Sequence, residues 1–384
     1  MVRPPRMDVD QWMQAYKAMG AKEVVFTAKH HDGFVLYPTR YSPHSVIASP
    51  WWIRTEGCAD AANVQAARER AQSQRGDGLG DAFWQVRDAG CANPQGDVLG
   101  TYIRAARAAG LRIGVYLSPS DGSELPHQWH EWSVVPATAD PSTAHNEGII
   151  PGGAQAGDIG SRTVLADPSV RYLQWFPAEA DVSIRPGWFF HPSEQPKSAS
   201  QLTTIYRTSV GRNALLLLNV PPGPDGRIAQ ADVDSLTAFG DAVRATYADN
   251  LLAPAVPSLT DDRLDTAWSP KGTTGTLELT LPGQRTFDQI RLGEAITHGQ
   301  QVEGFAVDRW DGSGWIRMTA GTTIGYSRIL TLSPAGHHGP HPRDHRAGAL
   351  DASPRVPRPL PQPLQLTLNK PGWSPVYVWL TRPS

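Results

Sequence analysis

Residues 10–33 read DQWMQAYKAMGAKEVVFTAKHHDG, and this stretch sets the fold class of the first part of the chain. Apolar residues recur near the helical interval between Asp10 and Met19, and Gly20 follows, which predicts a helix with a glycine C-cap. Residues 22–28, KEVVFTA, form a short and continuously apolar run. Such runs are typical of strands buried in a parallel sheet. The stretch therefore predicts a helix and then a buried strand.

The same alternation continues over about 250 residues. Helices are predicted over 97–110, 198–212 and 229–247. Buried strands are predicted over 111–121 and over 213–227, where the apolar run enters a Pro/Gly loop. Alternating helices and buried strands indicate an α/β fold with parallel strands. We expect residues 1–248 to form a partial (β/α)8, TIM-like barrel.

The sequence pattern changes after residue 248. Short alternating segments with turn signals, such as TLELTLPG and FDQIRLGEAI, predict an antiparallel β-sandwich over 249–334. Residues 335–384 begin with a Pro/His/Arg-rich tract and are expected to be an irregular tail. The tract holds a possible histidine metal cluster, although a shifted reading frame also explains it; its histidines are His337, His338, His341 and His345.

Composition excludes several classes of function. The formal net charge is -2, so no basic field indicates binding to nucleic acid or to an anionic membrane. No apolar run is long enough to span a bilayer, and residues 1–12 lack the apolar core of a signal peptide. The chain has 2 cysteines, Cys58 and Cys91, which either form a disulfide or remain buried thiols. The sequence does not indicate an oligomeric state.

Polar residues follow two of the predicted strands. His30, His31 and Asp32 come after the strand at 22–28, and Asp121 ends the strand at 111–121. In a parallel α/β barrel, functional groups gather at the C-terminal ends of the strands. Histidine rings can hydrogen-bond the hydroxyls of a sugar or transfer protons. This position predicts a site at the end of the first strand, although one ring could instead cap backbone carbonyls.

These residues belong to a longer pattern. The stretch FTAKHHDGFVLYPTRYSPHSVI resembles the corresponding motif of family 29 glycoside hydrolases, the α-L-fucosidases. Further stretches in the same order resemble that family, among them EWSVVPATADP, LQWFPAEADVSIRPGWFFHPSE and SVGRNALLLLNVPP. The segments LTDDRLDTAW and EGFAVDRWDGSGWIRM resemble a discoidin-type carbohydrate-binding module.

The resemblance implies a retaining hydrolase that releases terminal L-fucose from glycans. Such an enzyme uses an aspartate nucleophile and a glutamate acid/base on opposite sides of the glycosidic bond. The family's fucose-binding residues correspond here to His30 and His31, and Arg185, Trp188 and Trp132 are further candidates for substrate binding. No metal or other cofactor is required by this chemistry. The expected partner is a fucosylated glycan, and the family acts mostly in the periplasm or outside the cell.

The sequence departs from the family pattern in the middle of the barrel. Members carry a strand with the nucleophile, a helix and a segment with the acid/base between the strand that ends at Asp121 and the EWSVVP stretch. Here only nine residues separate Asp121 from Glu131, which is too few for a strand, a crossover helix and another strand. A first strand ahead of residue 10 is also expected but not found. The catalytic pair is therefore left unassigned, with Glu131 as a weak candidate.

Three readings remain open. The chain is a fucosidase with doubtful turnover, a non-catalytic carbohydrate-binding protein that uses Trp268 and Trp310 of the sandwich, or a truncated or frameshifted gene product. The remaining acids of the barrel region that could replace a missing carboxylate are Asp121, Glu124, Glu131, Glu179, Asp181 and Glu194.

Overall fold

A computed structural model of the 384-residue chain describes residues 7–39, 44–46, 93, 96–117, 179–252, 259, 268–270, 272–281, 287–296, 301–322, 324–332, 364–369 and 376–381. The chain divides into two compact units that interleave along the sequence. The first contains 1–131, 183–197 and 220–240, and the second contains 132–182, 198–219 and 241–384. The units give no single boundary near residue 250, so the predicted division into domains stays a prediction.

Helix α1 (Val9–Met19) forms as the sequence predicted. The Asp8 side chain caps its first turn by accepting a hydrogen bond from the Gln11 backbone N–H at 3.0 Å. Gly20 ends the helix in the left-handed conformation with φ of 92°, which a residue with a Cβ adopts at a cost. The two caps fix where the chain turns into the following strand.

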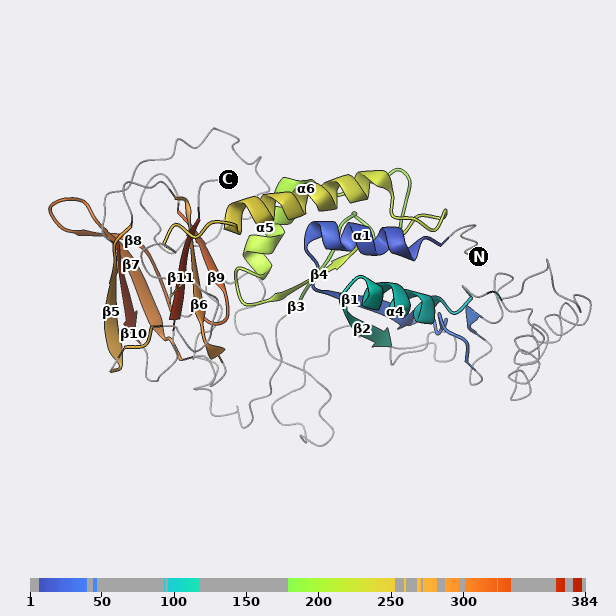
Figure 1. Cartoon of the computed structure of the whole chain (residues 1–384), viewed down its shortest axis with the longest axis horizontal. Coiled ribbons are helices and arrows are strands. Elements are labelled where there is room, and N and C mark those ends of the chain that lie inside the picture. Colours follow the sequence, from blue (N-terminus) through green and yellow to red (C-terminus); the bar gives the residue numbers. More distant parts are fainter. Residues whose placement is uncertain are drawn as a thin grey trace, which may run out of the picture. The chain divides into compact units, whose positions relative to one another are not determined.

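Strands β1 (Glu23–Lys29) and β2 (Arg112–Leu117) pair in parallel, as predicted, with Val24 opposite Ile113. Helix α4 (Val98–Ala108) precedes β2 and packs on both strands and on α1 (Figure 1). Its Tyr102 ring lies 6.3 Å from the Trp12 ring and 4.5 Å from the Phe26 ring, measured between centroids. Aromatic packing thus joins the helices to the N-terminal strand.

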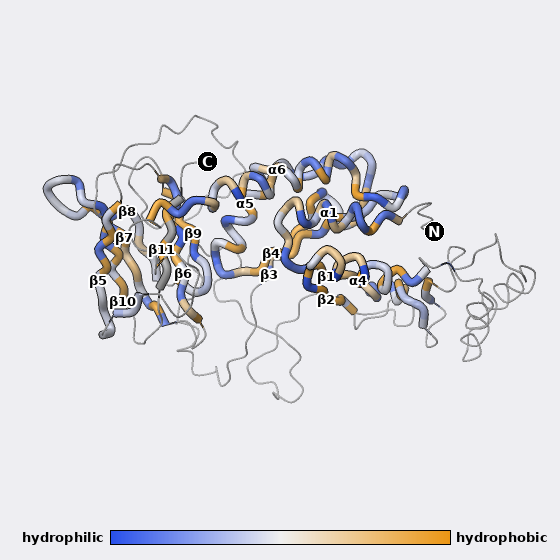
Figure 2. Tube along the Cα trace, in the orientation of Figure 1, coloured by the Kyte–Doolittle hydropathy of each residue, from blue (hydrophilic) through white to orange (hydrophobic). Residues whose placement is uncertain are grey.

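The burial expected for these strands is wrong for β2 and for part of β1. Both strands are rich in apolar residues (Figure 2). Val24 and Ala28 of β1 are buried, but Val25 is exposed, and so are Val115, Tyr116 and Leu117 of β2. Because side chains alternate across a strand, the end of β2 is exposed on both faces. Within the described ranges, β1 is the only strand paired with β2, which leaves its other edge without a strand.

The remaining elements of the first 248 residues are β3 (Glu179–Ser183), α5 (Ala199–Ser209), β4 (Leu215–Asn219) and α6 (Gln230–Tyr247). Three of them, α5, β4 and α6, follow the predicted order, and strand β3 was not predicted. β3 and β4 form a two-stranded sheet. Ser198 and Gln201 form a capping box at the start of α5, which explains why that helix begins there. Leu215 of the predicted buried strand is exposed.

The C-terminal part contains two antiparallel sheets. One has the order β5 (Thr274–Leu279), β10 (Leu364–Asn369), β7 (Gly304–Trp310) and β8 (Trp315–Gly321). The other has the order β11 (Val376–Thr381), β6 (Gln289–Glu294) and β9 (Arg328–Thr331). Buried residues of both sheets, among them Leu366 and Ile290, belong to one hydrophobic cluster.

Strands β10 and β11 correct the expectation of an irregular tail over 335–384. β10 is a central strand that pairs with β5 on one side and β7 on the other. Leu364, Leu366 and Leu368 are buried at alternate positions of β10, which is the period of a strand with one face on a core. The LQLTLN stretch alternates apolar and polar residues, as a strand does, but the Pro-rich residues before it led to the prediction of irregular structure. None of the helices in the described ranges is long and apolar enough to cross a membrane.

Two neighbouring valines of β1 test this description of burial. Val24 is 6% exposed and Val25 is 42% exposed. We expect Val24→Ala to lower the free energy of unfolding by about 2 kcal/mol because it removes buried methyl groups. Val25→Ala should change it by less than about 0.5 kcal/mol. Urea denaturation followed by circular dichroism measures both, and equal losses would contradict the exposure of this face.

Candidate functional site

The end of β1 presents two histidine rings side by side. After Lys29 the chain turns, with the Gly33 N–H donating to the His30 carbonyl at 2.9 Å. Gly33 has φ of 81°, and the Asp32 carboxylate accepts the Phe34 N–H at 3.0 Å. This turn holds the His30 and His31 rings 3.7 Å apart between centroids, each half-buried. The structure thus places the predicted pair where the sequence expected it, at the C-terminal end of a parallel strand.

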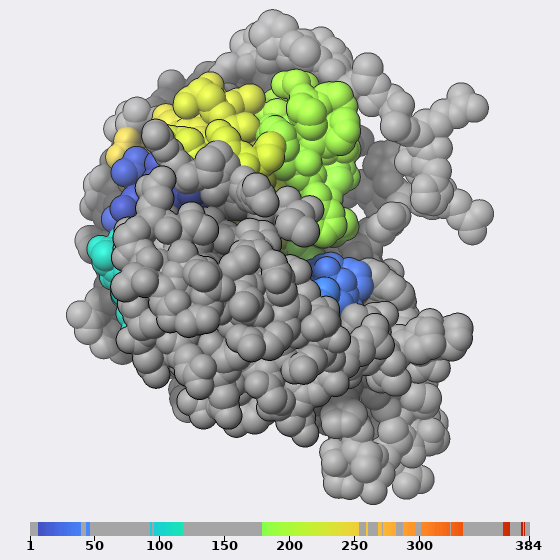
Figure 3. Space-filling model, turned by 90° about the vertical axis from the view of Figure 1, so that its right-hand side faces the viewer, coloured from blue at the N-terminus to red at the C-terminus, as the bar shows by residue number. Residues whose placement is uncertain are grey.

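A second segment, which follows β3, reaches His30. The Phe189 ring lies 6.1 Å from the His30 ring in an edge-on arrangement. Phe189 is 73% exposed, and its neighbour Trp188 is 50% exposed. In Figure 3 a blue surface from the N-terminal part of the chain lies beside a green surface from the part that begins at β3. Two exposed aromatic side chains therefore lie on the segment that meets the histidine pair.

Arg185 faces the interior of the first unit instead of the solvent. Its side chain is 3% exposed, and its Nε donates to the Asp232 carboxylate at 2.9 Å. Its Nη1 donates to the backbone carbonyls of His191, at 3.1 Å, and of Glu194. The guanidinium also lies over the Phe190 ring at 4.5 Å. The sequence predicted Arg185 as a substrate-binding residue, and the structure shows its guanidinium engaged with the protein.

Three acids of the first unit are also engaged with the protein. The Glu194 carboxylate accepts the Gly187 N–H at 3.3 Å, and Asp232 is buried against Arg185. Asp32 holds the turn after β1. Glu131 and Trp132 lie outside the described residues, as do Asp121 and Glu124, the two cysteines and the four histidines of the tail. The described residues contain no cluster of three or more potential metal ligands.

Glu179 and Asp181 lie two positions apart on β3, in the second unit, and so point to the same face of that strand. Partial burial raises the pKa of the Glu179 carboxyl, and the neighbouring Asp181 charge raises it further. Burial and a like charge both disfavour ionisation. The proton on Glu179 is therefore bound more tightly than in the unfolded chain, so its contribution to stability is lost as the pH rises through the folded pKa.

Sequence reasoning missed two residues of this site. Phe189 stands next to Trp188 in the Arg-Pro-Gly-Trp-Phe stretch, so an exposed aromatic pair could have been suspected there. Asp232 gave no such signal, because an acid in the first turn of a helix is ordinarily explained by the helix dipole. Only the fold shows that Asp232 meets Arg185.

Comparison with known proteins identifies the family. The profile of the Alpha-L-fucosidase family matches residues 1–53. Alpha-L-fucosidase 1 of Arabidopsis thaliana is 31% identical over 379 residues, which cover 85% of this chain and 73% of that protein. The chain belongs to the α-L-fucosidase family. This family consists of glycoside hydrolases, and the histidine pair falls within the residues that its profile matches.

Two further relatives agree. The putative alpha-L-fucosidase 1 of Oryza sativa subsp. japonica is 32% identical over 376 residues, covering 85% of this chain and 71% of that protein. A GH29 fucosidase from Ruminococcus gnavus, solved in complex with fucose, has a TM-score of 0.66 at 19% identity and covers 98% of this chain and 86% of that one. The last likeness is one of fold.

The carboxyl pair on β3 of this fucosidase-family chain yields a titration prediction. Asp181→Asn should lower the pKa of Glu179, but not to its ordinary value, because the burial that is the larger cause remains. A carboxyl-detected NMR titration of the wild-type chain and the variant measures the change. Asp241→Asn, on α6, is the control. An unchanged Glu179 pKa in Asp181→Asn would show that the two groups do not interact.

Proposed function

We propose that this chain binds a terminal L-fucose residue of a glycan at the end of β1, with His30, His31 and Trp188 in contact with the sugar. The observation that carries the proposal is the approach of Phe189 to His30. It joins two stretches of the chain that resemble fucosidase sequences. Family membership makes L-fucose the expected sugar.

The chemistry of these side chains suits a deoxysugar. L-Fucose has hydroxyls that imidazole nitrogens can hydrogen-bond as donor or acceptor. It also has an apolar side with a methyl group, which an exposed aromatic ring can cover. Phe189 provides such a ring beside His30, and the exposed Trp188 precedes it on the same segment. Trp132 is a further candidate from its position in the family motif.

We further propose that the pair of carboxylates needed for bond cleavage is missing. Retaining glycosidases need two carboxyl groups about 5–5.5 Å apart, one on each side of the anomeric carbon. Only nine residues separate Asp121 from Glu131, where the family places the nucleophile and the acid/base. Glu131 stands nearest to the acid/base position in the sequence, and nothing in the sequence gives it a partner. The chain then keeps the binding half of the site without the half that breaks the bond.

The architecture we infer is a partial TIM-like barrel over 1–248, followed by a discoidin-like β-sandwich from residue 249. The parallel β1–β2 pair and the alternating helices support the barrel. Two antiparallel sheets that share one hydrophobic cluster support the sandwich. As in most of the family, we expect the protein to act in the periplasm or outside the cell.

Of the alternatives, binding through the sandwich aromatics has less support. Trp268 packs against the hydrophobic cluster, and Trp310 faces Trp315 across the β7–β8 pair at 5.5 Å between ring centroids. Both contacts are ordinary structural uses of tryptophan. The truncated-gene reading explains the same missing segment, and genomic sequence with the missing codons nearby would support it.

The test combines binding with turnover. We expect L-fucose to shift NMR signals of the folded wild-type chain, and we expect His31→Ala to weaken that binding about five- to tenfold because it loses a hydrogen bond or two. His44→Ala, which alters a ring that packs against Phe34, is the matched histidine control.

On an aryl α-L-fucoside at high protein concentration, wild type should release no more aryl alcohol than His31→Ala. Release above that control would show that an acid such as Glu131 has taken over catalysis. A folded wild-type chain without fucose binding would overturn the proposed site.

A further inference from the structure

A buried ion pair joins the segment after β3 to helix α6. The Arg185 and Asp232 side chains are 3% and 0% exposed, and their Nε and Oδ2 atoms lie 2.9 Å apart. The second oxygen of Asp232 is buried and has no hydrogen-bond partner among the described residues. Burying two charges costs desolvation energy that their attraction often fails to offset. Stability alone therefore does not explain why this pair is here.

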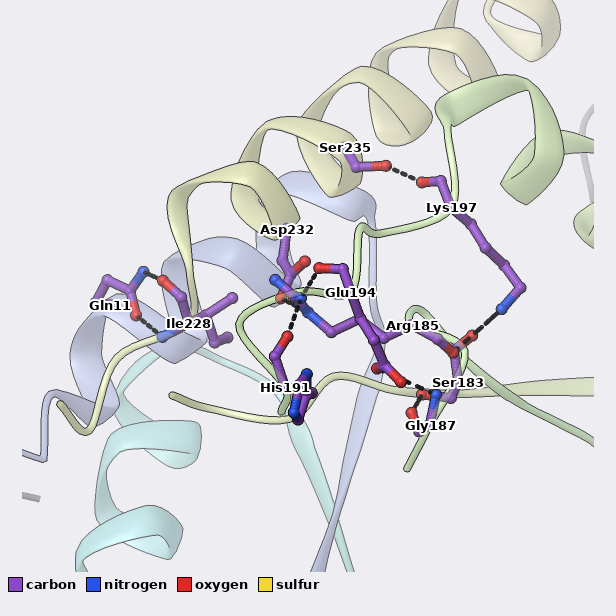
Figure 4. Close-up of polar contacts among 10 residues, drawn as sticks. All are labelled: Gln11, Ser183, Arg185, Gly187, His191, Glu194, Lys197, Ile228, Asp232 and Ser235. Atoms are coloured by element: carbon purple, nitrogen blue, oxygen red, sulfur yellow. Dashed lines mark hydrogen bonds and ion pairs between the residues drawn. The ribbon is translucent and has the colours of Figure 1, made fainter. Parts of the chain in front are cut away.

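The other bonds of the guanidinium indicate what the pair does. Arg185 donates to the carbonyls of His191 and Glu194, at the far end of residues 187–194, which we name the aromatic loop. The near end is held by Ser183, whose hydroxyl donates to the Gly187 carbonyl at 2.7 Å, and by Glu194, which accepts the Gly187 N–H. Figure 4 shows these contacts converging around Arg185. Hydrogen bonds from Arg185, Ser183 and Glu194 therefore hold both ends of the aromatic loop.

A second set of contacts holds this frame to the same helix. The Lys197 ammonium donates to the Ser183 carbonyl at 2.6 Å, and the Ser235 hydroxyl of α6 donates to the Lys197 carbonyl (Figure 4). Asp232 and Ser235 lie three positions apart and so share one face of α6. The helix therefore anchors both the arginine and the end of the segment that follows the loop.

The loop needs such a frame because of what it exposes. Trp188 and Phe189 are 50% and 73% exposed, so burial alone contributes little to holding this backbone in place. Exposing large apolar rings costs free energy in the unliganded protein. The hydrogen bonds at the two ends of the loop therefore help to hold Phe189 beside His30.

We propose that Arg185 is a positioning residue of the fucose site: with Asp232, it holds the aromatic loop so that Phe189 stands beside His30 and the adjacent Trp188 is presented from the same loop. The link between Arg185 and L-fucose rests on the proposed function. The effect of Arg185 on the order of the aromatic loop does not, so hydrogen exchange of the loop and fucose binding can fail independently.

The experiment uses the full chain with Arg185→Lys, Trp188→Ala and the double variant. Lysine keeps the buried positive charge opposite Asp232 but loses the planar fork that reaches two carbonyls. Asp232→Asn, on α6, removes the negative charge that pairs with Arg185. The control is Arg244→Lys, in an ion pair with Asp241 in which both side chains are at least half exposed. Two quantities are measured, amide hydrogen exchange of peptides spanning 186–196 and L-fucose affinity by NMR titration.

We expect Arg185→Lys and Asp232→Asn to raise amide exchange in the aromatic loop about tenfold and to weaken fucose binding about tenfold. The double variant Arg185→Lys/Trp188→Ala should bind no more than about twofold worse than Trp188→Ala, because residues that act through one another are not additive. Arg244→Lys should leave both readouts unchanged.

Three other outcomes would overturn the proposal. Additive losses in the double variant would mean that Arg185 contacts the sugar directly. Unchanged loop exchange with a lower melting temperature would leave Arg185 a purely structural residue. Raised loop exchange in Arg185→Lys, with no fucose binding by wild type, would keep the loop frame but remove both the proposed function and the link to fucose.

Discussion

The buried contact between Arg185 and Asp232 connects the parts of the first unit that form the site. Asp232 lies in the first turn of α6, and the residues just before that helix bind α1. The Gln11 side chain exchanges two hydrogen bonds with the Ile228 backbone, each of 3.0 Å, and the Trp12 indole donates to the Gly226 carbonyl. Helix α1 in turn leads into β1 and so to His30. A continuous series of bonds therefore runs from the aromatic loop to the histidine pair.

Close backbone packing supports the same series. A Cβ at Gly240 of α6 would lie 2.1 Å from the Ala18 carbonyl of α1, so only glycine allows the two helices this approach. Polar and steric constraints thus act at both ends of the α1–α6 contact. The site residues themselves contribute little to this packing, since Trp188 and Phe189 are exposed. Recognition surfaces are commonly built this way, on a scaffold that does not depend on them.

Strands β2 and β4 expose apolar residues that the sequence predicted to be buried. The continuous apolar sequence of β2 predicts burial on both faces. Its last three residues are nevertheless exposed, as is Leu215 of β4. Open parallel edges and bare apolar side chains are uncommon in stable α/β proteins. This agrees with the proposal that an internal strand–helix–strand segment of the fucosidase barrel is missing. In that proposal the same segment would also carry the catalytic carboxylates, so its loss would affect both the cover of these strands and turnover.

Local chemistry could be predicted from sequence where it acts within a few residues. Asp8 and Gly20 limit α1, Ser198 begins α5, and the His30–His31 pair ends β1, because caps and hydrophobic periods are local properties. β10 was missed despite its alternation, because its partners β5 and β7 lie more than about 50 residues earlier and the proline-rich tract before it favours irregular structure.

Tertiary structure alone decided the pairings that make the site. Nothing in the sequence places Phe189 against His30 or Asp232 against Arg185, since each pair depends on how distant elements pack. The exposure of β2 was likewise undetermined. An apolar run shows that a strand can be buried, but whether a neighbour exists to cover it is a property of the folded chain.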